Sequence, residues 1–189
     1  MKINVANMLT LSRLVLVPFY IASFALGYKG EAFVIFCIAG TTDLIDGTVA
    51  RFFGEQSKWG ALIDPVADKL LMQSCFISLV VTGFIPQWFF ALAFARDLVI
   101  VSGIFYLERK KFELPYKPTW ISKFATLFQL GVAVLGLLRW WNPSLELADW
   151  QMWTIYITAA LIIISGVKYV LMGFEILRKK NTTSCPKIV

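Results

Sequence analysis

Six long apolar stretches, separated by short polar connections, run along the chain. Each is close to the ~20 residues that an α-helix needs to cross the ~30 Å hydrocarbon core of a bilayer. We therefore expect an all-α integral membrane protein with six transmembrane helices. They would form one membrane domain over residues 1–177, followed by a short basic cytoplasmic tail at residues 178–189. The apolar stretches lie at residues 10–26, 32–53, 65–84, 86–107, 120–138 and 150–172.

The third of these helices is expected to begin at a proline. Pro65 lacks a backbone N–H, which costs nothing in the first turn of a helix, where that group has no partner. Asp64, directly before it, has the side chain of a typical N-cap residue. The sequence therefore predicts a helix start at Asp64 and Pro65.

Composition supports the membrane assignment and excludes several kinds of site. Hydrophobic residues make up 58% and charged residues 16% of the 189 residues, and the mean hydropathy is +0.70. An ordinary soluble domain is about 45–50% hydrophobic and about 25% charged. The chain contains no His, which excludes imidazole catalysis and His-ligated metals. Three Cys without a Cys-x-x-Cys pair indicate neither a disulfide framework nor a zinc site.

Lysine and arginine residues are divided unevenly between the two sets of connections. Cytoplasmic loops of membrane proteins carry the excess of these residues, so we expect both termini and the connections after the second and fourth helices to be cytoplasmic. Topology and contact with anionic lipids account for the net charge of +6, and no nucleic-acid partner is expected. The rich side holds Lys2, Arg51, Lys58, Lys69, Arg109, Lys110, Lys111, Lys117, Lys123, Arg178, Lys179, Lys180 and Lys187, and the other side Lys29 and Arg139.

Four carboxylates gather where the second apolar stretch ends and the third begins. Asp43 and Asp46 are three residues apart, and Asp64 and Asp68 are four apart, so each pair shares one face of its helix. A short connection makes the two helices antiparallel neighbours, which brings the carboxylates together near the cytoplasmic side. Ionisable residues at membrane depth are costly and mark functional sites.

Divalent cations would let all four carboxylates stay ionised, since like charges at close range otherwise oppose one another's ionisation. An oxygen-only cage suits Mg²⁺ or Mn²⁺, with Ca²⁺ as a further option. Two such ions about 4 Å apart form a clamp for displacement at phosphorus. Gly47 and Ala50 leave room for a phosphate ligand, Arg51 could neutralise its charge, and Asp68 could also take a proton.

Three other interpretations are open on these residues alone. The carboxylates could be solvated helix ends, although that gives no reason for two pairs in register. They could form a cation relay in a transporter, although no matching acidic set lies at the opposite ends of the helices. A non-catalytic membrane scaffold or anchor would not need four aspartates in register either.

The spacing of these residues resembles the signature of the CDP-alcohol phosphotransferases. Every position of that signature is present, in the order Asp43-x2-Asp46-Gly47-x2-Ala50-Arg51-x8-Gly60-x3-Asp64-x3-Asp68. The six-helix layout is similar to the family throughout the chain. The resemblance implies that an acceptor hydroxyl attacks the phosphorus next to the diacylglycerol of CDP-diacylglycerol, and that CMP leaves.

The resemblance also implies roles for individual residues. Two metal ions, Mg²⁺ or Mn²⁺, would be held by the four aspartates Asp43, Asp46, Asp64 and Asp68. Asp68 would also be the catalytic general base. The CDP-diacylglycerol pocket would be lined by Gly47, Ala50, Arg51 and Gly60.

Two further features bear on the acceptor alcohol. The start of the chain, Asn7 to Arg13 followed by Pro18, resembles the phosphatidylglycerol and cardiolipin branch of the family. Arg13 could contact a substrate phosphate, or snorkel to the headgroups. Arg96 could grip an acceptor phosphate, or pair with Asp97 in a purely structural role.

The fifth helix departs from the phosphatidylglycerophosphate synthases, which usually show Gly-Lys-x-Lys-Thr-x-x-Gln there. Ser122 replaces the Gly and Ala125 replaces the second Lys, while Lys123, Thr126 and Gln129 are kept. Losing a cation weakens the case for glycerol 3-phosphate, which is a dianion. This segment is similar to that of the eukaryotic-type cardiolipin synthases, whose acceptor is phosphatidylglycerol. The similarity rests on Lys-Pro-Thr-x-x-Ser-Lys here and on Arg-Asp in the fourth helix.

We expect glycerol 3-phosphate as the acceptor, with phosphatidylglycerol as the alternative and inositol phosphate or serine as less favoured ones. The residues expected to bind the acceptor or its phosphate are Arg13, Arg96 and Lys123. CDP-diacylglycerol and membrane lipids are the other expected partners, and homodimers are common in the family. A compact member without a targeting extension is expected in a bacterial inner membrane, with its active site facing the cytoplasm.

Overall fold

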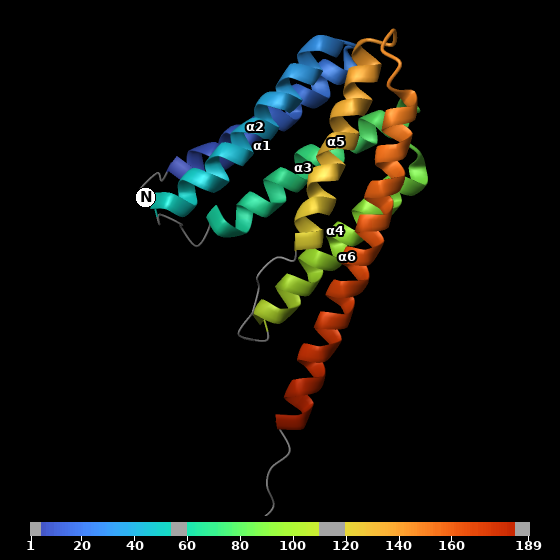
Figure 1. Ribbon diagram of the computed structural model, residues 1–189. Helices are drawn as coiled ribbons and strands as arrows, with labels where there is room; N and C mark the ends of the chain where they lie inside the picture. The colour runs from blue at the N-terminus through green and yellow to red at the C-terminus, as the bar shows by residue number, and fades with distance from the viewer. Residues whose placement is uncertain (1–4, 54–59, 110–119, 184–189) are drawn as a thin grey trace, which may run out of the picture. The chain divides into compact units, whose positions relative to one another are not determined.

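The computed structural model describes the backbone of residues 5–53, 60–109 and 120–183, and the side chains of residues 15–42, 69–103 and 120–173. Within these ranges the chain is helical and has no strand, which confirms the all-α class there. The helices, shown in Figure 1, are α1 (Val5–Ala25), α2 (Lys29–Phe53), α3 (Gly60–Val81), α4 (Gln87–Arg109), α5 (Trp120–Trp141) and α6 (Ala148–Thr183).

Two segments of the described chain are long and apolar enough to cross a membrane. They are Trp120–Trp141, which is the whole of α5, and Ala148–Gly173 of α6. Shorter apolar segments lie at Val15–Ala25 and Lys69–Val81, within α1 and α3. Helices of this length and composition suggest that the protein associates with a membrane.

The predicted start of the third helix at Asp64 and Pro65 is wrong. α3 already begins at Gly60, so both residues lie inside the helix and Asp64 is not its N-cap. Pro65 is the sixth residue of α3, beyond the first turn where the N–H groups have no partner, so it removes one backbone hydrogen bond of the helix. At the other end of the chain, α6 continues to Thr183 and so includes the first part of the predicted basic tail.

The chain forms two compact units, which are described separately. Unit 1 comprises Met1–Pro86 and Leu130–Gln151, and unit 2 comprises Gln87–Gln129 and Met152–Val189. Unit 1 therefore holds α1, α2, α3 and the last part of α5. Unit 2 holds α4, the first part of α5 and most of α6.

The core of unit 1 is built on α1, which contacts both α2 and α3 and runs beside α2 in Figure 1. Tyr20 of α1 is fully buried, and its ring centroid lies 6.1 Å from that of Phe36 on α2. Phe24 of α1 stacks on Trp140 of α5 at 4.1 Å. Full burial of one such apolar side chain contributes about 1.5–3 kcal/mol, so these aromatic contacts fix the packing of the helices.

The turns at one end of unit 1 depend on glycine. Gly27 and Gly83 follow α1 and α3 with φ angles of 76° and 77°, a left-handed conformation that glycine adopts without strain. The amide of Phe84 then donates to the carbonyl of Leu79 at 2.8 Å, which closes the last turn of α3. The glycines thus let the chain reverse directly after each helix.

Gln151, at the start of α6, ties three segments together at the same end of unit 1. Its side chain is fully buried, its Oε1 accepts a hydrogen bond from Arg139 Nη1, and its Nε2 donates to the carbonyl of Phe84 at 2.9 Å. The guanidinium of Arg139 also lies 5.4 Å from the centroid of the Phe84 ring. Both ends of the buried amide are therefore paired, as buried polar groups require.

Within unit 2, α4 and α6 meet through aromatic side chains. The rings of Trp88 and Tyr156 stack at 6.1 Å with an interplanar angle of 21°. Phe89 and Ala93 of α4 are fully buried, as is Thr158 of α6. Thr158 donates its hydroxyl hydrogen to the carbonyl of Thr154 at 2.6 Å, which satisfies that polar group within its own helix.

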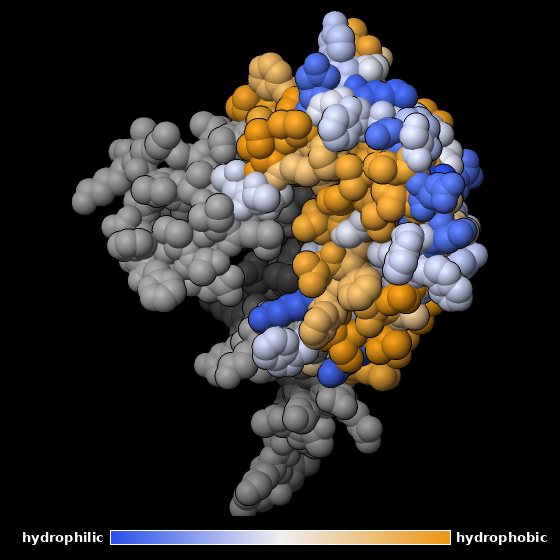
Figure 2. Space-filling model, turned by 45° about the horizontal axis from the view of Figure 1, so that its top comes forward, coloured by the Kyte–Doolittle hydropathy of each residue, from blue (hydrophilic) through white to orange (hydrophobic). Residues whose placement is uncertain are grey.

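Large apolar side chains are exposed along α6. Figure 2 shows apolar residues, in orange, over much of the coloured surface. Soluble monomers rarely expose continuous apolar patches of more than a few hundred Å², whereas lipid-facing helices do so throughout. On α6 the exposed residues include Trp150, Trp153, Tyr156, Ile157, Ile163, Ile164, Val167, Val170 and Leu171.

Candidate active site

The four predicted metal ligands lie on two helices that contact each other. Asp43 and Asp46 belong to the C-terminal part of α2, and Asp64 and Asp68 to the first half of α3. α2 and α3 are in contact, and Figure 1 shows the end of α2 and the start of α3 at the same end of unit 1. Because both segments are helical, the spacing of each pair does place it on one helix face.

The side chains of these aspartates lie outside the described residues. The same is true of the other residues predicted for the CDP-diacylglycerol pocket and of Arg13 on α1, namely Gly47, Ala50, Arg51, Gly60 and Arg13. No group of three or more Cys, Asp or Glu side chains that could hold a metal occurs among the residues whose side chains are described. An oxygen-only set of four carboxylates on two contacting helices is chemically suited to a hard divalent cation.

Arg96 is the predicted acceptor residue whose surroundings the structure describes most fully. Only 5% of its surface is exposed, and its Nη1 lies 2.9 Å from Oδ1 of Asp97, which is 7% exposed. Its Nη2 donates to Oγ of Ser122 at 2.5 Å, across from α4 to α5. The buried cation is thus neutralised by its neighbour and joined to α5, as a charge in an apolar environment must be.

Lys123 does not share these contacts, although it is the residue next to Ser122. Successive residues of an α-helix point about 100° apart, so Lys123 leaves α5 on a different side. It is exposed, and its ammonium lies 5.1 Å from the centroid of the Trp120 ring, in a cation–π arrangement. The structure therefore brings Arg96 and Ser122 together and places Lys123 away from that contact.

Sequence reasoning did not single out Ser122 and Gln129 as site residues. Ser122, Ala125 and Gln129 are spaced by three and four residues and form one buried face of α5, with exposures of 9%, 0% and 3%. The Nε2 atom of Gln129 makes no hydrogen bond in the described part of the chain. The retention of Gln129 in a family motif was the signal available from the sequence.

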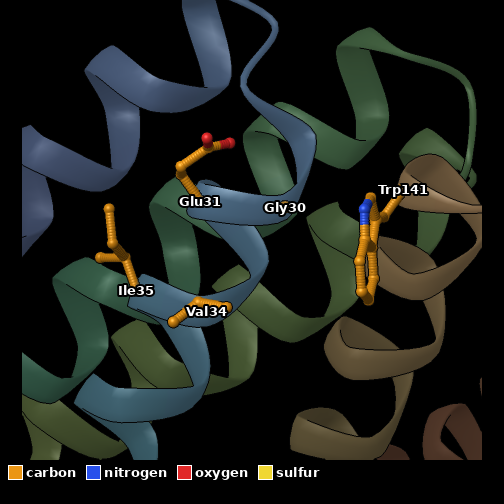
Figure 3. Close-up of a pocket in the computed structure, with 5 residues that line it drawn as sticks. All are labelled: Gly30, Glu31, Val34, Ile35 and Trp141. Carbon is orange, nitrogen blue, oxygen red and sulfur yellow. The ribbon is translucent and has the colours of Figure 1, made fainter.

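A separate open pocket lies in unit 1, at the other end of α2. It has a volume of about 640 Å³ and is lined by Gly30, Glu31, Val34, Ile35 and Trp141. Figure 3 shows Glu31 and Ile35 extending from one side of α2. Trp141, on α5, lies opposite Gly30 of α2. Twelve residues of helix, about 18 Å, separate Glu31 from Asp43. The pocket therefore does not belong to the carboxylate site.

Comparison with known proteins identifies the family. Residues 3–164 match the family model of the CDP-alcohol phosphatidyltransferases. The match covers well over half of the chain, so the protein belongs to this family and is an enzyme of the phosphatidyltransferase class. This confirms the resemblance drawn from the aspartate signature.

Individual relatives carry two different names. A "Probable cardiolipin synthase (CMP-forming)" of Drosophila melanogaster is 34% identical over 94% of this chain, which spans only 61% of the length of that relative. A "CDP-diacylglycerol--glycerol-3-phosphate 3-phosphatidyltransferase" of Shigella flexneri serotype 5b is 31% identical over 88% of this chain and 89% of its own length. The enzyme of the same name from Escherichia coli is likewise 31% identical over 88% of this chain.

Proposed function

We propose that the protein transfers a phosphatidyl group from CDP-diacylglycerol to glycerol 3-phosphate and releases CMP. The observation that carries this proposal is the complete aspartate signature on α2 and α3 in a chain that matches the family model over residues 3–164. Relatives named for this reaction cover most of the chain. The reaction belongs to phospholipid biosynthesis.

Each atom in the proposed step has a defined destination. The oxygen of the acceptor hydroxyl forms a bond to the phosphorus that carries the diacylglycerol. The bond from that phosphorus to the bridging oxygen breaks, and CMP leaves with the electron pair. Asp68 takes the hydroxyl proton as general base. The proposed contacts to CDP-diacylglycerol are Gly47, Ala50, Arg51 and Gly60. The small residues Gly47 and Ala50 on α2 leave space for the ligand, and Arg51 neutralises the charge of its phosphate.

Two divalent metal ions, Mg²⁺ or Mn²⁺, would be held by the carboxylates of Asp43, Asp46, Asp64 and Asp68. Such ions supply positive charge that stabilises the phosphate oxygens during displacement at phosphorus. The carboxylates keep the cations in place, and the cations in turn allow four acidic groups to remain ionised together.

Arg13, Arg96 and Lys123 are the proposed contacts to the acceptor phosphate. Phosphatidylglycerol is a second candidate acceptor, which would make the enzyme a cardiolipin synthase. Two observations favour phosphatidylglycerol. The positive charge of Arg96 is already balanced by the carboxylate of Asp97. Ala125 is fully buried at the position where phosphatidylglycerophosphate synthases usually have a second lysine. A phosphate diester needs less positive charge around it than the dianionic monoester does.

We further propose that the helices form one membrane domain over residues 1–177 with six spans, both termini and the active site facing the cytoplasm. The tail from residue 178 would lie on the cytoplasmic side, and a bacterial inner membrane is the proposed location. The excess of Lys and Arg on one set of connections supports this orientation. A homodimer is compatible with it.

The test is CMP release by purified protein in micelles containing CDP-diacylglycerol. Glycerol 3-phosphate and phosphatidylglycerol would be supplied in separate reactions with Mg²⁺ or Mn²⁺. We expect release to require an acceptor and a metal, to stop with a chelator, and to resume when metal is returned. Stimulation by glycerol 3-phosphate alone supports the first candidate, and stimulation by phosphatidylglycerol alone supports the second. No CMP release with either would overturn the proposal.

Aspartate variants test the metal assignment in the same assay. Asp43→Ala and Asp64→Ala should lower kcat about 100-fold or more, because each removes charge that stabilises the reacting phosphate. Asp149→Ala is the matched control, since Asp149 is an exposed carboxylate in the first turn of α6 and should leave activity unchanged. Wild-type CMP release by either purified variant would remove its aspartate from the metal site.

A further inference from the structure

The open pocket of unit 1 is bounded on one side by a single face of α2. Glu31, Val34 and Ile35 are spaced by three and four residues from the first of them, so their side chains share that face. Trp141 of α5 forms the opposite wall, beside Gly30 (Figure 3). The volume of about 640 Å³ lies in the usual range of ligand pockets, which is about 300–1,000 Å³. The pocket is therefore large enough to hold a ligand.

Trp141 is fixed in place by its contacts with α2. Its ring stacks on that of Phe33 at 5.5 Å, with an interplanar angle of 21°. A Cβ built on Gly30 would lie 3.4 Å from Nε1 of Trp141, so the indole lies directly against the backbone of α2. The side chain is still exposed in part. The portion of the ring that does not pack on α2 thus forms a preformed wall of the pocket.

The pocket is apolar apart from one carboxylate. Val34 is exposed and Ile35 is half-buried, whereas Glu31 is exposed and forms no ion pair or hydrogen bond with the residues that the structure describes. Lys29 does not neutralise Glu31, because it leaves the helix about 200° away and its ammonium lies 5.5 Å from the centroid of the Trp140 ring. The first turn of a helix attracts negative charge. The pocket therefore combines an apolar surface with an uncompensated negative charge.

Tryptophan residues gather at this end of unit 1. Trp140 and Trp141 end α5, and Trp150 lies in the first turn of α6 with an exposed ring. Tryptophan is enriched where a membrane meets water, because its ring is apolar and its N–H is polar. On helices that associate with a membrane, these residues place the pocket at the depth of the lipid headgroups.

The charge of Glu31 selects among the molecules that could cover the apolar surface. An apolar helix of a second copy would bury the carboxylate without supplying a cation, which is unfavourable. A phospholipid with an anionic headgroup supplies no cation either. A phospholipid with an ammonium headgroup does, and its acyl chain can cover Val34 and Ile35 while the headgroup stays in water. A primary ammonium also has three N–H donors for the carboxylate.

We propose that this pocket is a specific binding site for a zwitterionic phospholipid whose headgroup carries a primary ammonium. The ammonium pairs with Glu31, and one acyl chain lies against Val34, Ile35 and the open part of Trp141. The pocket is separate from the aspartates, so the bound lipid is neither the donor nor the acceptor of the proposed reaction. The inference therefore does not rest on the proposed function, and binding can be measured without substrate or metal.

The experiment compares three phospholipids with identical acyl chains, namely phosphatidylethanolamine, phosphatidylcholine and phosphatidylglycerol. Phosphatidylcholine has the positive charge but no N–H donor, and phosphatidylglycerol has no positive charge. Native mass spectrometry of the purified full-length protein in detergent gives the Kd of the first bound lipid. We expect phosphatidylethanolamine to bind with a Kd about fivefold lower than that of phosphatidylglycerol, because one partly solvated ion pair contributes about that factor. Phosphatidylcholine should lie between them.

Glu31→Gln assigns the preference to the carboxylate. The substitution keeps the length of the side chain and removes its charge, so the Kd values of the three lipids should become about equal. Glu146→Gln is the matched control, because Glu146 is an exposed carboxylate of unit 1 in the connection between α5 and α6, outside the pocket. It should keep the full preference.

Val34→Trp tests the cavity itself. An indole at this position would fill the pocket and should raise the Kd of phosphatidylethanolamine to that of phosphatidylglycerol. Ile38→Trp is the control on the same helix. Ile38 is 52% exposed and Val34 is 50% exposed, but Ile38 does not line the pocket. The control should therefore leave all three Kd values unchanged.

Equal Kd values for the three lipids in the wild-type protein would overturn the proposal, even if no variant could be purified. A preference that survives Glu31→Gln or Val34→Trp would overturn it as well. A dimer in the same spectra that Val34→Trp dissociates and Ile38→Trp does not would assign the pocket to a second copy of the chain instead. Absence of CMP release would overturn only the proposed function, because lipid binding is measured without substrate.

Discussion

Replacing Gly136 by alanine should destabilise unit 1 through overpacking. Gly136 lies on α5, and a Cβ built on it would be 2.7 Å from Leu79 Cδ1 and 3.1 Å from Gln151 Nε2. Neither neighbour can move away freely. Leu79 is fully buried, and Nε2 of Gln151 is held at 2.9 Å from the carbonyl of Phe84. The added methyl group must therefore displace packed atoms.

The magnitude follows from these distances. Packed carbon atoms prefer separations of about 3.5–4.0 Å, so the Leu79 contact would have to open by about 1 Å. Overpacking of a filled core costs about 1–3 kcal/mol. In a chain of this size each kcal/mol changes the unfolding midpoint by about 2–4 °C, which gives an expected loss of about 2–12 °C relative to a neutral Gly→Ala change.

Gly166→Ala on α6 provides that neutral comparison. No heavy atom lies within 4 Å of a Cβ built at Gly166, and alanine favours a helix interior over glycine by about 0.8–1.0 kcal/mol. Its midpoint should equal or exceed that of the wild type. Both variants would be heated in the same detergent at one scan rate, with helix content followed by circular dichroism. A Gly136→Ala midpoint at or above that of Gly166→Ala would refute the overpacking argument.

Two further predictions concern the acceptor residues. Asp97→Ala should cost about 3–5 kcal/mol of stability, because it leaves the buried Arg96 cation without the carboxylate at 2.9 Å. Adding Arg96→Met should recover part of the loss, and thermal unfolding of a double variant no more stable than Asp97→Ala would contradict this. Lys123→Ala should barely change stability, since Lys123 is exposed, but should raise the acceptor KM more than the CDP-diacylglycerol KM. An acceptor KM equal to that of the wild type would remove Lys123 from the acceptor site.

The sequence predicted the aspartate pairs of the candidate site more fully than it predicted the surroundings of Arg96 and Lys123. The pairing of the aspartates could be predicted because their spacing is local: residues three and four apart share a helix face wherever the helix packs. Their role as metal ligands stays a prediction. The roles of Arg96 and Lys123 could not be separated in this way. Both are cations near the expected acceptor, and nothing in their spacing tells which one is buried. The structure separates them, because one reaches Ser122 on another helix and the other lies over Trp120.

By itself, the sequence determined the helical class, the approximate extent of the six described helices and the spacing of the aspartates along α2 and α3. These features depend on apolar composition and on the helical repeat, which act within a few residues of the chain. Helix ends were less certain, as the start of α3 at Gly60 shows, because the expected N-cap at Asp64 competed with continued helix formation upstream.

Only the tertiary structure decided which polar groups meet. Arg96 and Ser122 are 26 residues apart, and Phe84 and Gln151 are 67 apart. Such pairs depend on the rotation and offset of whole helices, which the pattern of a single helix does not specify. The same packing leaves Nε2 of Gln129 buried without an acceptor in the described part of the chain. A donor of that kind becomes visible only when the surroundings of every neighbouring side chain are known.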